Sequence, residues 1–267
     1  MTAISTTPET AAPAITANRG RFVWHELMTT DVDAAREFYS KVIGWTSQQS
    51  DMAGMEYVLW MTGETPVGGL MKLSADAAEM GAPPSWLAYV EVPDADATIA
   101  QATQLGATVL TEPMTVDQVG RFAILRDPQG AVIAVITSAN AHQPENDPAI
   151  HEFSWHELTT GDQNAAVEFY QALFGWESKG ELDMGEQGVY KMFGRDRFTY
   201  GGVMFQAPGM PGPYWLHYIR VDSADAAVER ATEAGGKVML PPLEVPGGDR
   251  VAILTDPQGA VFAVHSK

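Results

Sequence analysis

The sequence contains no cysteine, which excludes disulfides, thiolate nucleophiles, zinc fingers and cysteine-held iron–sulfur clusters. It is also poor in positive charge: 16 Lys and Arg stand against 34 Asp and Glu, and the formal net charge is -18. Such a surface repels phosphate backbones and anionic lipid, so we expect neither nucleic acid nor a membrane as partner. No apolar run approaches the roughly 20 residues that span a bilayer. These absences predict a soluble acidic protein with a neutral or cationic small-molecule ligand.

The length of 267 residues and a hydrophobic content of 45% suit about two packed domains. Residues 1–20 are small, polar and interrupted by proline, and they lack the basic start and apolar segment of a secretory signal. We therefore expect a disordered tail over residues 1–20 and a cytoplasmic protein. We expect a monomer or a homodimer.

The strongest feature of the sequence is an internal duplication. The segments WHELMTTDVDAAREFYSKVIGW from Trp24 and WHELTTGDQNAAVEFYQALFGW from Trp155 are identical at 13 of 22 positions, at an offset of 131. Average residue usage would give about one or two identities. A second pair, FAILRDPQGAVIAVITS and VAILTDPQGAVFAVHSK, shares 11 of 17 positions. The sequence therefore predicts two copies of one unit, at residues 21–140 and 151–267, with a polar linker at residues 141–150.

Each copy contains a smaller repeat. Four segments follow one order: an alternating β-favouring run, an Asp, an amphipathic run that ends in Gly, and further strand-like runs. Each Asp would cap a helix by accepting from its free amides. These positions are Asp31, Asp94, Asp162 and Asp222. The pattern predicts an α+β fold of four strand–helix–strand–strand–strand modules, at residues 22–75, 84–138, 153–207 and 213–266.

This order, with its EFY helices and two DPQGAV turns, resembles the vicinal oxygen chelate superfamily. That superfamily contains glyoxalase I, extradiol ring-cleavage dioxygenases, fosfomycin-resistance enzymes and bleomycin-binding proteins. The likeness covers about residues 21–267, and the WHEL and GGLM/GGVM segments are similar to a two-domain, glyoxalase-like subgroup. The resemblance implies that two modules curl their sheets into one open cup. The chain would then hold two tandem open-barrel, cup-shaped domains.

Members of this superfamily usually hold a divalent metal with His and Glu side chains that project into the cup. Carried over on the EFY and DPQG segments, the ligand positions fall on Trp24, Leu87 and Ala134 in the first copy and on Trp155, Leu216 and Ala263 in the second. A further position falls near Lys72 in the first copy and near Phe205 in the second. None of these offers the imidazole or carboxylate that a divalent ion needs. We therefore expect no metal ligands and no cofactor, unless the strand register is misread.

The pairs His25–Glu26 and His156–Glu157 adjoin the lost ligand positions. Neighbouring residues of a strand point to opposite faces. With Trp24 inside the cup, Glu26 would also face the cup and His25 would face the helices. We interpret His25 and His156 as structural. A shift of one residue would instead make His25 a candidate metal ligand.

The same alternation gives each cup aromatic walls and a few polar groups, which is typical of small-molecule pockets. The first cup would contain Trp24, Glu26, Tyr89 and Glu91. The second would contain Trp155, Glu157, Tyr218, Arg220 and His265. We assign catalysis to Glu157 and His265, because His titrates near neutrality and burial raises the pKa of Glu. We assign substrate binding to the other residues of the two cups. Alternatively, the rings fill the cups as core, and Glu26 and Glu157 reach solvent.

Three functions are compatible with these features. The first is glyoxalase- or dioxygenase-like action on a small organic molecule in metabolism or detoxification, without the usual metal site. The second is metal-free binding and sequestration of the bleomycin-resistance type. The third is a structural module with filled cups. The loss of metal ligands favours a binding protein, the resemblance favours an enzyme, and the sequence leaves the choice open.

Overall fold

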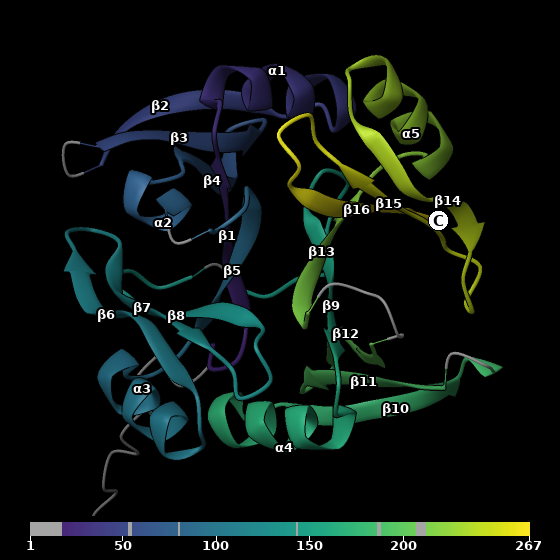
Figure 1. The fold of residues 1–267 in the computed structure, drawn as a ribbon. Coiled ribbons are helices and arrows are strands. Elements are labelled where there is room, and N and C mark those ends of the chain that lie inside the picture. Colours follow the sequence, from purple (N-terminus) through teal and green to yellow (C-terminus); the bar gives the residue numbers. More distant parts are fainter. Residues whose placement is uncertain (1–17, 53–54, 80, 143, 186–187, 207–211) are drawn as a thin grey trace, which may run out of the picture.

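The computed structural model describes residues 18–52, 55–79, 81–142, 144–185, 188–206 and 212–267. These residues form two eight-stranded mixed sheets with a few short helices, which confirms the predicted α+β class and its tandem arrangement (Figure 1). Residues 1–17 of the predicted tail lie outside the described residues. None of the helices in the described ranges is long and apolar enough to cross a membrane.

The first sheet has the strand order β2-β3-β4-β1-β5-β8-β7-β6. β1 and β5 lie antiparallel at its centre, and β4 and β8 run parallel to them on either side. The strands are β1 (Phe22–Thr29), β2 (Thr46–Met52), β3 (Met55–Thr62), β4 (Thr65–Lys72), β5 (Ser85–Glu91), β6 (Thr108–Val116), β7 (Gly120–Arg126) and β8 (Val132–Ser138). The helices of this half are α1 (Val32–Val42), α2 (Ala75–Glu79) and α3 (Ala95–Gln104).

The second sheet repeats this order as β10-β11-β12-β9-β13-β16-β15-β14. Its strands are β9 (Phe153–Thr160), β10 (Glu177–Asp183), β11 (Val189–Arg195), β12 (Phe198–Phe205), β13 (Tyr214–Arg220), β14 (Lys237–Glu244), β15 (Arg250–Thr255) and β16 (Val261–Ser266). The helices are α4 (Gln163–Phe174) and α5 (Ala224–Glu233). The identical order in both halves follows from the duplicated sequence.

The helix starts follow the predicted capping chemistry with one exception. The carboxylates of Asp31, Asp94 and Asp162 accept hydrogen bonds from amides of the first turn of α1, α3 and α4. At α5 the cap is Ser223, whose hydroxyl accepts from the amide of Ala226. The prediction of Asp222 was therefore wrong by one residue, because Ser is also a good N-cap and stands next to it.

The helices pack across the two halves of the chain. α1 lies beside α5, and α3 lies beside α4 (Figure 1). One buried cluster accordingly combines residues of the first and fourth modules, and another combines residues of the second and third. The helix-covered faces of the two sheets thus share two cores, and the halves fold against each other.

Two buried carboxylates form hydrogen bonds between the two halves of the chain. Asp127, in the turn before β8, accepts a hydrogen bond from the hydroxyl of Tyr170 on α4 at 2.9 Å. Asp256, in the matching turn of the second half, accepts one from Tyr39 on α1 at 3.3 Å. The EFY and DPQG segments, which identified the repeat, therefore contact each other between the halves.

The other face of each sheet carries a smaller apolar cluster. We call these faces the first cup, with Leu87, Tyr89, Ala134 and Ile136, and the second cup, with Leu216, Tyr218, Val251 and Ala263. Trp24 packs in the first cup and Trp155 in the second. The predicted alternation, with these tryptophans facing the cups, agrees with this packing.

Candidate functional site

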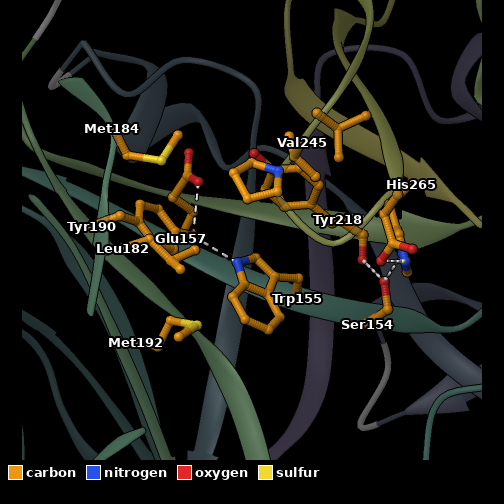
Figure 2. Close-up of a pocket in the computed structure, with 13 residues that line it drawn as sticks. Ser154, Trp155, Glu157, Leu182, Met184, Tyr190, Met192, Tyr218, Val245 and His265 are labelled. Atoms are coloured by element: carbon orange, nitrogen blue, oxygen red, sulfur yellow. Dashed lines mark hydrogen bonds and ion pairs between the residues drawn. The ribbon is translucent and has the colours of Figure 1, made fainter. Parts of the chain in front are cut away.

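A cavity of about 210 Å³ opens in the second cup (Figure 2). It brings together four predicted site residues: Trp155, Glu157, Tyr218 and His265. The other lining residues are Ser154, Leu182, Met184, Tyr190, Met192, Val245, Pro246, Asp249 and Val251. Apolar and aromatic walls thus surround a few polar groups, which is the usual composition of a small-molecule site.

Glu157 is held in this cavity by two tyrosines. The Tyr190 hydroxyl donates to Glu157 Oε2 at 3.0 Å, and the Tyr218 hydroxyl donates to the same carboxylate. Trp155 Nε1 donates to the Tyr190 hydroxyl oxygen at 2.7 Å, which continues the chain of hydrogen bonds (Figure 2). Burial raises the pKa of Glu157, and the two tyrosine hydrogen bonds oppose that rise. A buried carboxyl with an elevated pKa suits proton transfer.

A glycine makes this contact possible. A Cβ on Gly202 of β12 would lie 2.0 Å from the Tyr190 ring, so any larger residue there would displace the tyrosine from Glu157. Gly69 plays the same part in the first half, where a Cβ would lie 1.8 Å from the Tyr57 hydroxyl. Sequence reasoning missed Tyr57 and Tyr190, although the paired glycines signalled a close approach at this strand.

The first cup repeats the carboxylate network. Tyr57 and Tyr89 donate to Glu26 at 2.9 and 3.1 Å. Trp24 Nε1 donates to the Tyr57 hydroxyl oxygen at 2.9 Å. Burial raises the pKa of Glu26, which is only 8% exposed. Glu26 is thus held by buried hydroxyls and does not extend to the solvent.

The two cups differ beyond this network. His265 Nδ1 lies 2.9 Å from the Ser154 hydroxyl, and its Nε2 lies 3.2 Å from Asp249 Oδ2. Burial lowers the pKa of His265, and the Asp249 carboxylate opposes that decrease. Ile136 stands at the matching position of the first half. The second cup alone therefore combines the buried Glu with a His–Asp pair at this position.

Two predicted site residues have other partners. Arg220 donates to the carbonyl oxygen of Pro148 at 2.6 Å, and it is not among the residues that line the cavity. Glu91 is 3% exposed and accepts from the Ser138 amide and hydroxyl. Its Oε2 also lies 2.9 Å from His142 Nε2. These contacts hold both side chains near the linker.

The expectation of no metal ligands and no cofactor was wrong. His25 on β1, His156 on β9 and His217 on β13 form one buried group, whose ring nitrogens lie within 4.8 Å of one another and could hold a metal ion. The strand register was not the cause. Trp24, Leu87 and Ala134 do lie together in the first cup, and His25 faces away from it. The prediction treated each half alone, whereas the faces that carry the histidines meet between the two sheets.

Burial lowers the pKa of all three histidines below the ordinary value of 6.5, and for His217 the pKa falls to about 3. Below pH 6.5 the unfolded chain therefore binds more protons than the folded chain, and stability decreases with acidification. Each such histidine contributes up to about 1.4 kcal/mol per pH unit.

This linkage predicts a difference between the wild type and His217→Ala. In chelator-treated protein, we expect the unfolding free energy of the variant to decrease less steeply between about pH 6 and pH 4, by about 1.4 kcal/mol per pH unit. Urea unfolding at several pH values measures both slopes. Equal slopes would show that His217 does not stay neutral in the fold.

Comparison with known proteins relates both halves of the chain to one family. Residues 21–135 and 150–264 each match the family described as "Glyoxalase/Bleomycin resistance protein/Dioxygenase superfamily". The "Putative glyoxylase CFP32" of Mycobacterium tuberculosis is 33% identical over 250 residues, which cover 90% of this chain and 92% of that protein. The "Anthracycline biosynthesis protein DnrV" of Streptomyces peucetius is 31% identical over 258 residues and 92% of each chain.

Solved structures share the fold at much lower identity. The Mn(II)-bound glyoxalase from Novosphingobium aromaticivorans superimposes with a TM-score of 0.57 at 17% identity, over 93% of this chain and 82% of that chain. At this identity the likeness concerns the arrangement of strands and helices alone.

Proposed function

The chain belongs to the glyoxalase/bleomycin resistance protein/dioxygenase superfamily, and we propose that it binds and converts a small organic molecule in its second cup. The observation that carries this proposal is the cavity of about 210 Å³ that joins Glu157, His265 and the aromatic walls. Metabolism or detoxification is the proposed context, in the cytoplasm, with the protein as a monomer or homodimer.

Four of the lining residues have a proposed role in binding or proton transfer. Trp155 and Tyr218 would hold the apolar or aromatic body of the ligand. Glu157 would exchange a proton with the ligand, since burial raises its pKa and its two tyrosine partners fix its position. His265, oriented by Asp249 at 3.2 Å, would act as the second acid–base group. A cavity with two carboxyl groups favours a neutral or cationic ligand over an anion.

The relatives indicate two ligand classes for a first screen. One relative carries the name of a glyoxylase, and another is named for anthracycline biosynthesis. The corresponding candidates are α-ketoaldehydes and polycyclic aromatic metabolites. The mostly apolar lining of the cavity suits the second class, provided that part of a larger ligand lies outside its mouth.

A thermal-shift screen of these compounds tests the proposal. A ligand at 100 times its Kd should stabilise the wild type by about 2.7 kcal/mol, which corresponds to a rise in Tm of about 5–10 °C. Trp155→Ala should abolish the rise, whereas Trp24→Ala, the matched change in the first cup, should preserve it. A rise that survives Trp155→Ala and disappears in Trp24→Ala would place the ligand in the first cup and contradict the proposal.

Binding without conversion is the second candidate function. It is favoured by the repetition of the same Trp, Tyr, Tyr and Glu network in the first cup, where Ile136 replaces His265. Because this hydrogen-bond network is also present where the histidine is absent, its role can be to hold the shape of the cup and not to catalyse a reaction. A ligand that raises Tm but is recovered unchanged after prolonged incubation would support sequestration over catalysis.

A further inference from the structure

We propose that His25, His156 and His217 form a binding site for one zinc-class divalent cation that joins the two halves of the chain. His25 comes from the first sheet, and His156 and His217 come from the second. The site lies between the sheets, outside the second cup, so it does not depend on the function proposed above.

The spacing of the three rings suits one tetrahedral ion. The ring centroids lie 5.0 Å apart for His25 and His156, 5.2 Å for His25 and His217, and 5.4 Å for His156 and His217. With Zn–N bonds of 2.0–2.1 Å and tetrahedral angles, the centroids of three imidazoles on one ion would lie about 5.2 Å apart. The centroid spacing therefore needs no rearrangement of the sheets, and the ring nitrogens, which lie within 4.8 Å of one another, need only turn toward a common point to bind one ion.

The orientation of the rings agrees with this spacing. Phe22 stacks on His156 at 3.7 Å and lies 6.4 Å from His25, while the His25 and His156 rings are nearly parallel at 11°. The Phe22 ring lies above His156, so a His25 ring beside His156 in the same plane would lie about 6.2 Å from Phe22, on the diagonal of the 3.7 and 5.0 Å separations. The observed 6.4 Å is close to this value, so His25 lies beside His156 and not beneath it. Lone pairs of imidazole nitrogens lie in the ring plane, so two rings placed edge to edge can share one ion. His217 meets them at 64–70° from a third direction.

Two nitrogen atoms of the group hydrogen-bond each other, and two others are buried without a partner among the described residues. The Nδ1 atoms of His156 and His217 lie 3.2 Å apart and share one hydrogen bond. An ion bound by both would take the place of the shared proton, since this distance is close to the roughly 3.3 Å between two ligand atoms on a tetrahedral zinc. Nε2 of His25 and Nε2 of His217 are buried without a hydrogen-bond partner among the described residues. A neutral imidazole has one nitrogen with a free lone pair, and this is the form that binds a metal ion.

The donor set selects the class of ion. Among the described residues the group consists of three imidazoles. Imidazole suits Zn²⁺ and its neighbours Co²⁺, Ni²⁺ and Cu²⁺, whereas Mg²⁺, Ca²⁺ and Mn²⁺ prefer oxygen ligands. We therefore expect Zn²⁺ to bind in preference to Mg²⁺ and Mn²⁺.

A second cavity offers a route to the site. It measures about 350 Å³, includes His156 in its lining, and carries the carboxylates Glu145, Asp147 and Glu152. The lining also includes Arg21 and Arg197, and Arg21 pairs with Glu145 at 3.8 Å, so the carboxylates exceed the cationic groups by one and favour a cation only modestly. The same cavity could supply the water that completes a tetrahedral site with three protein ligands.

Metal binding to chelator-treated and dialysed protein tests the proposal. The wild type should retain one Zn²⁺ or Co²⁺ per chain by elemental analysis, and bound Co²⁺ should show the intense visible absorption of a tetrahedral site. Mg²⁺ and Mn²⁺ should be lost on dialysis. His217→Ala should bind Zn²⁺ at least about 100-fold more weakly. Removing a residue that only hydrogen-bonds a metal ligand already lowers metal affinity by about 10–100-fold.

The matched variants exclude simpler explanations. Ala88 occupies the place in the first half that His217 occupies in the second, since Ala88 pairs with His25 as His217 pairs with His156, and His217→Ala therefore introduces a residue that the fold already accommodates there. His151→Asn changes a histidine outside the group at a left-handed position that Asn tolerates, and should leave Zn²⁺ affinity unchanged. Wild-type protein that loses Zn²⁺ and Co²⁺ on dialysis, or equal affinity in His217→Ala, would overturn the proposal. If His217→Ala does not fold, weak octahedral Co²⁺ absorption in the wild type would overturn it as well.

Discussion

The Glu157→Gln variant should convert the second-cup substrate about 10²–10⁴-fold more slowly than the wild type, with little change in ligand affinity. Glutamine has almost the same shape as glutamate. Its Oε1 can still accept from one of the two tyrosines that donate to Glu157, and its amide group can donate to the hydroxyl oxygen of the other. The amide cannot exchange a proton in the same way. The rate therefore reports the proton-transfer role separately from the shape of the cavity, with kcat measured on the compound found in the ligand screen.

The duplicated half of the chain provides the control. Glu26→Gln makes the same change in a carboxylate held by the matching pair of tyrosines, Tyr57 and Tyr89. We expect kcat of this variant to stay within about 3-fold of the wild type, because Glu26 lies in the first cup and is not among the residues that line the cavity of the second. Equal losses in both variants would attribute the effect to the shared network. An unchanged rate in Glu157→Gln would remove Glu157 from the reaction.

Strand alternation and helix-capping chemistry made much of the fold predictable from the sequence. A residue that alternates with Trp155 along β9 must share its face, so Glu157 could be placed in the second cup before any coordinates. Asp31, Asp94 and Asp162 could be placed at helix starts because a short acceptor satisfies free amides there. Both inferences depend on contacts within one strand or one turn.

Contacts between the repeats could not be predicted in the same way. The metal prediction failed at His217, which meets His25 only because the two sheets pack through the faces that carry these histidines. Four similar modules do not specify which helix packs on which, and α1 lies beside α5 of the other half. Nor does the sequence show that Tyr190 reaches Glu157, because that contact depends on the space above Gly202.

The Asp127→Ala variant should be destabilised by about 3–5 kcal/mol, a large effect for one substitution. Asp127 is 4% exposed, and its Oδ1 accepts from the amides of Gln129, Gly130 and Ala131 at 2.9, 2.7 and 2.9 Å. Its Oδ2 accepts from Tyr170 of the other half at 2.9 Å. Alanine leaves all four donors without this acceptor, and the amide of the fully buried Ala131 cannot turn to water instead. Urea unfolding of the full chain measures the loss.

Tyr170→Phe separates the two parts of this effect. It removes the hydrogen bond that the Tyr170 hydroxyl donates to Asp127 and also the one that this hydroxyl accepts from Trp215 Nε1 at 3.2 Å within the second half. It should cost about 2–3 kcal/mol, and the part of the Asp127→Ala loss beyond this cost belongs to the turn. Both variants should still unfold in one transition, because Asp256 and Tyr39 make the matching contact at the other helix pair. Equal costs in the two variants would mean that the turn amides find other acceptors. Two separate transitions would mean that the shared cores do not couple the halves.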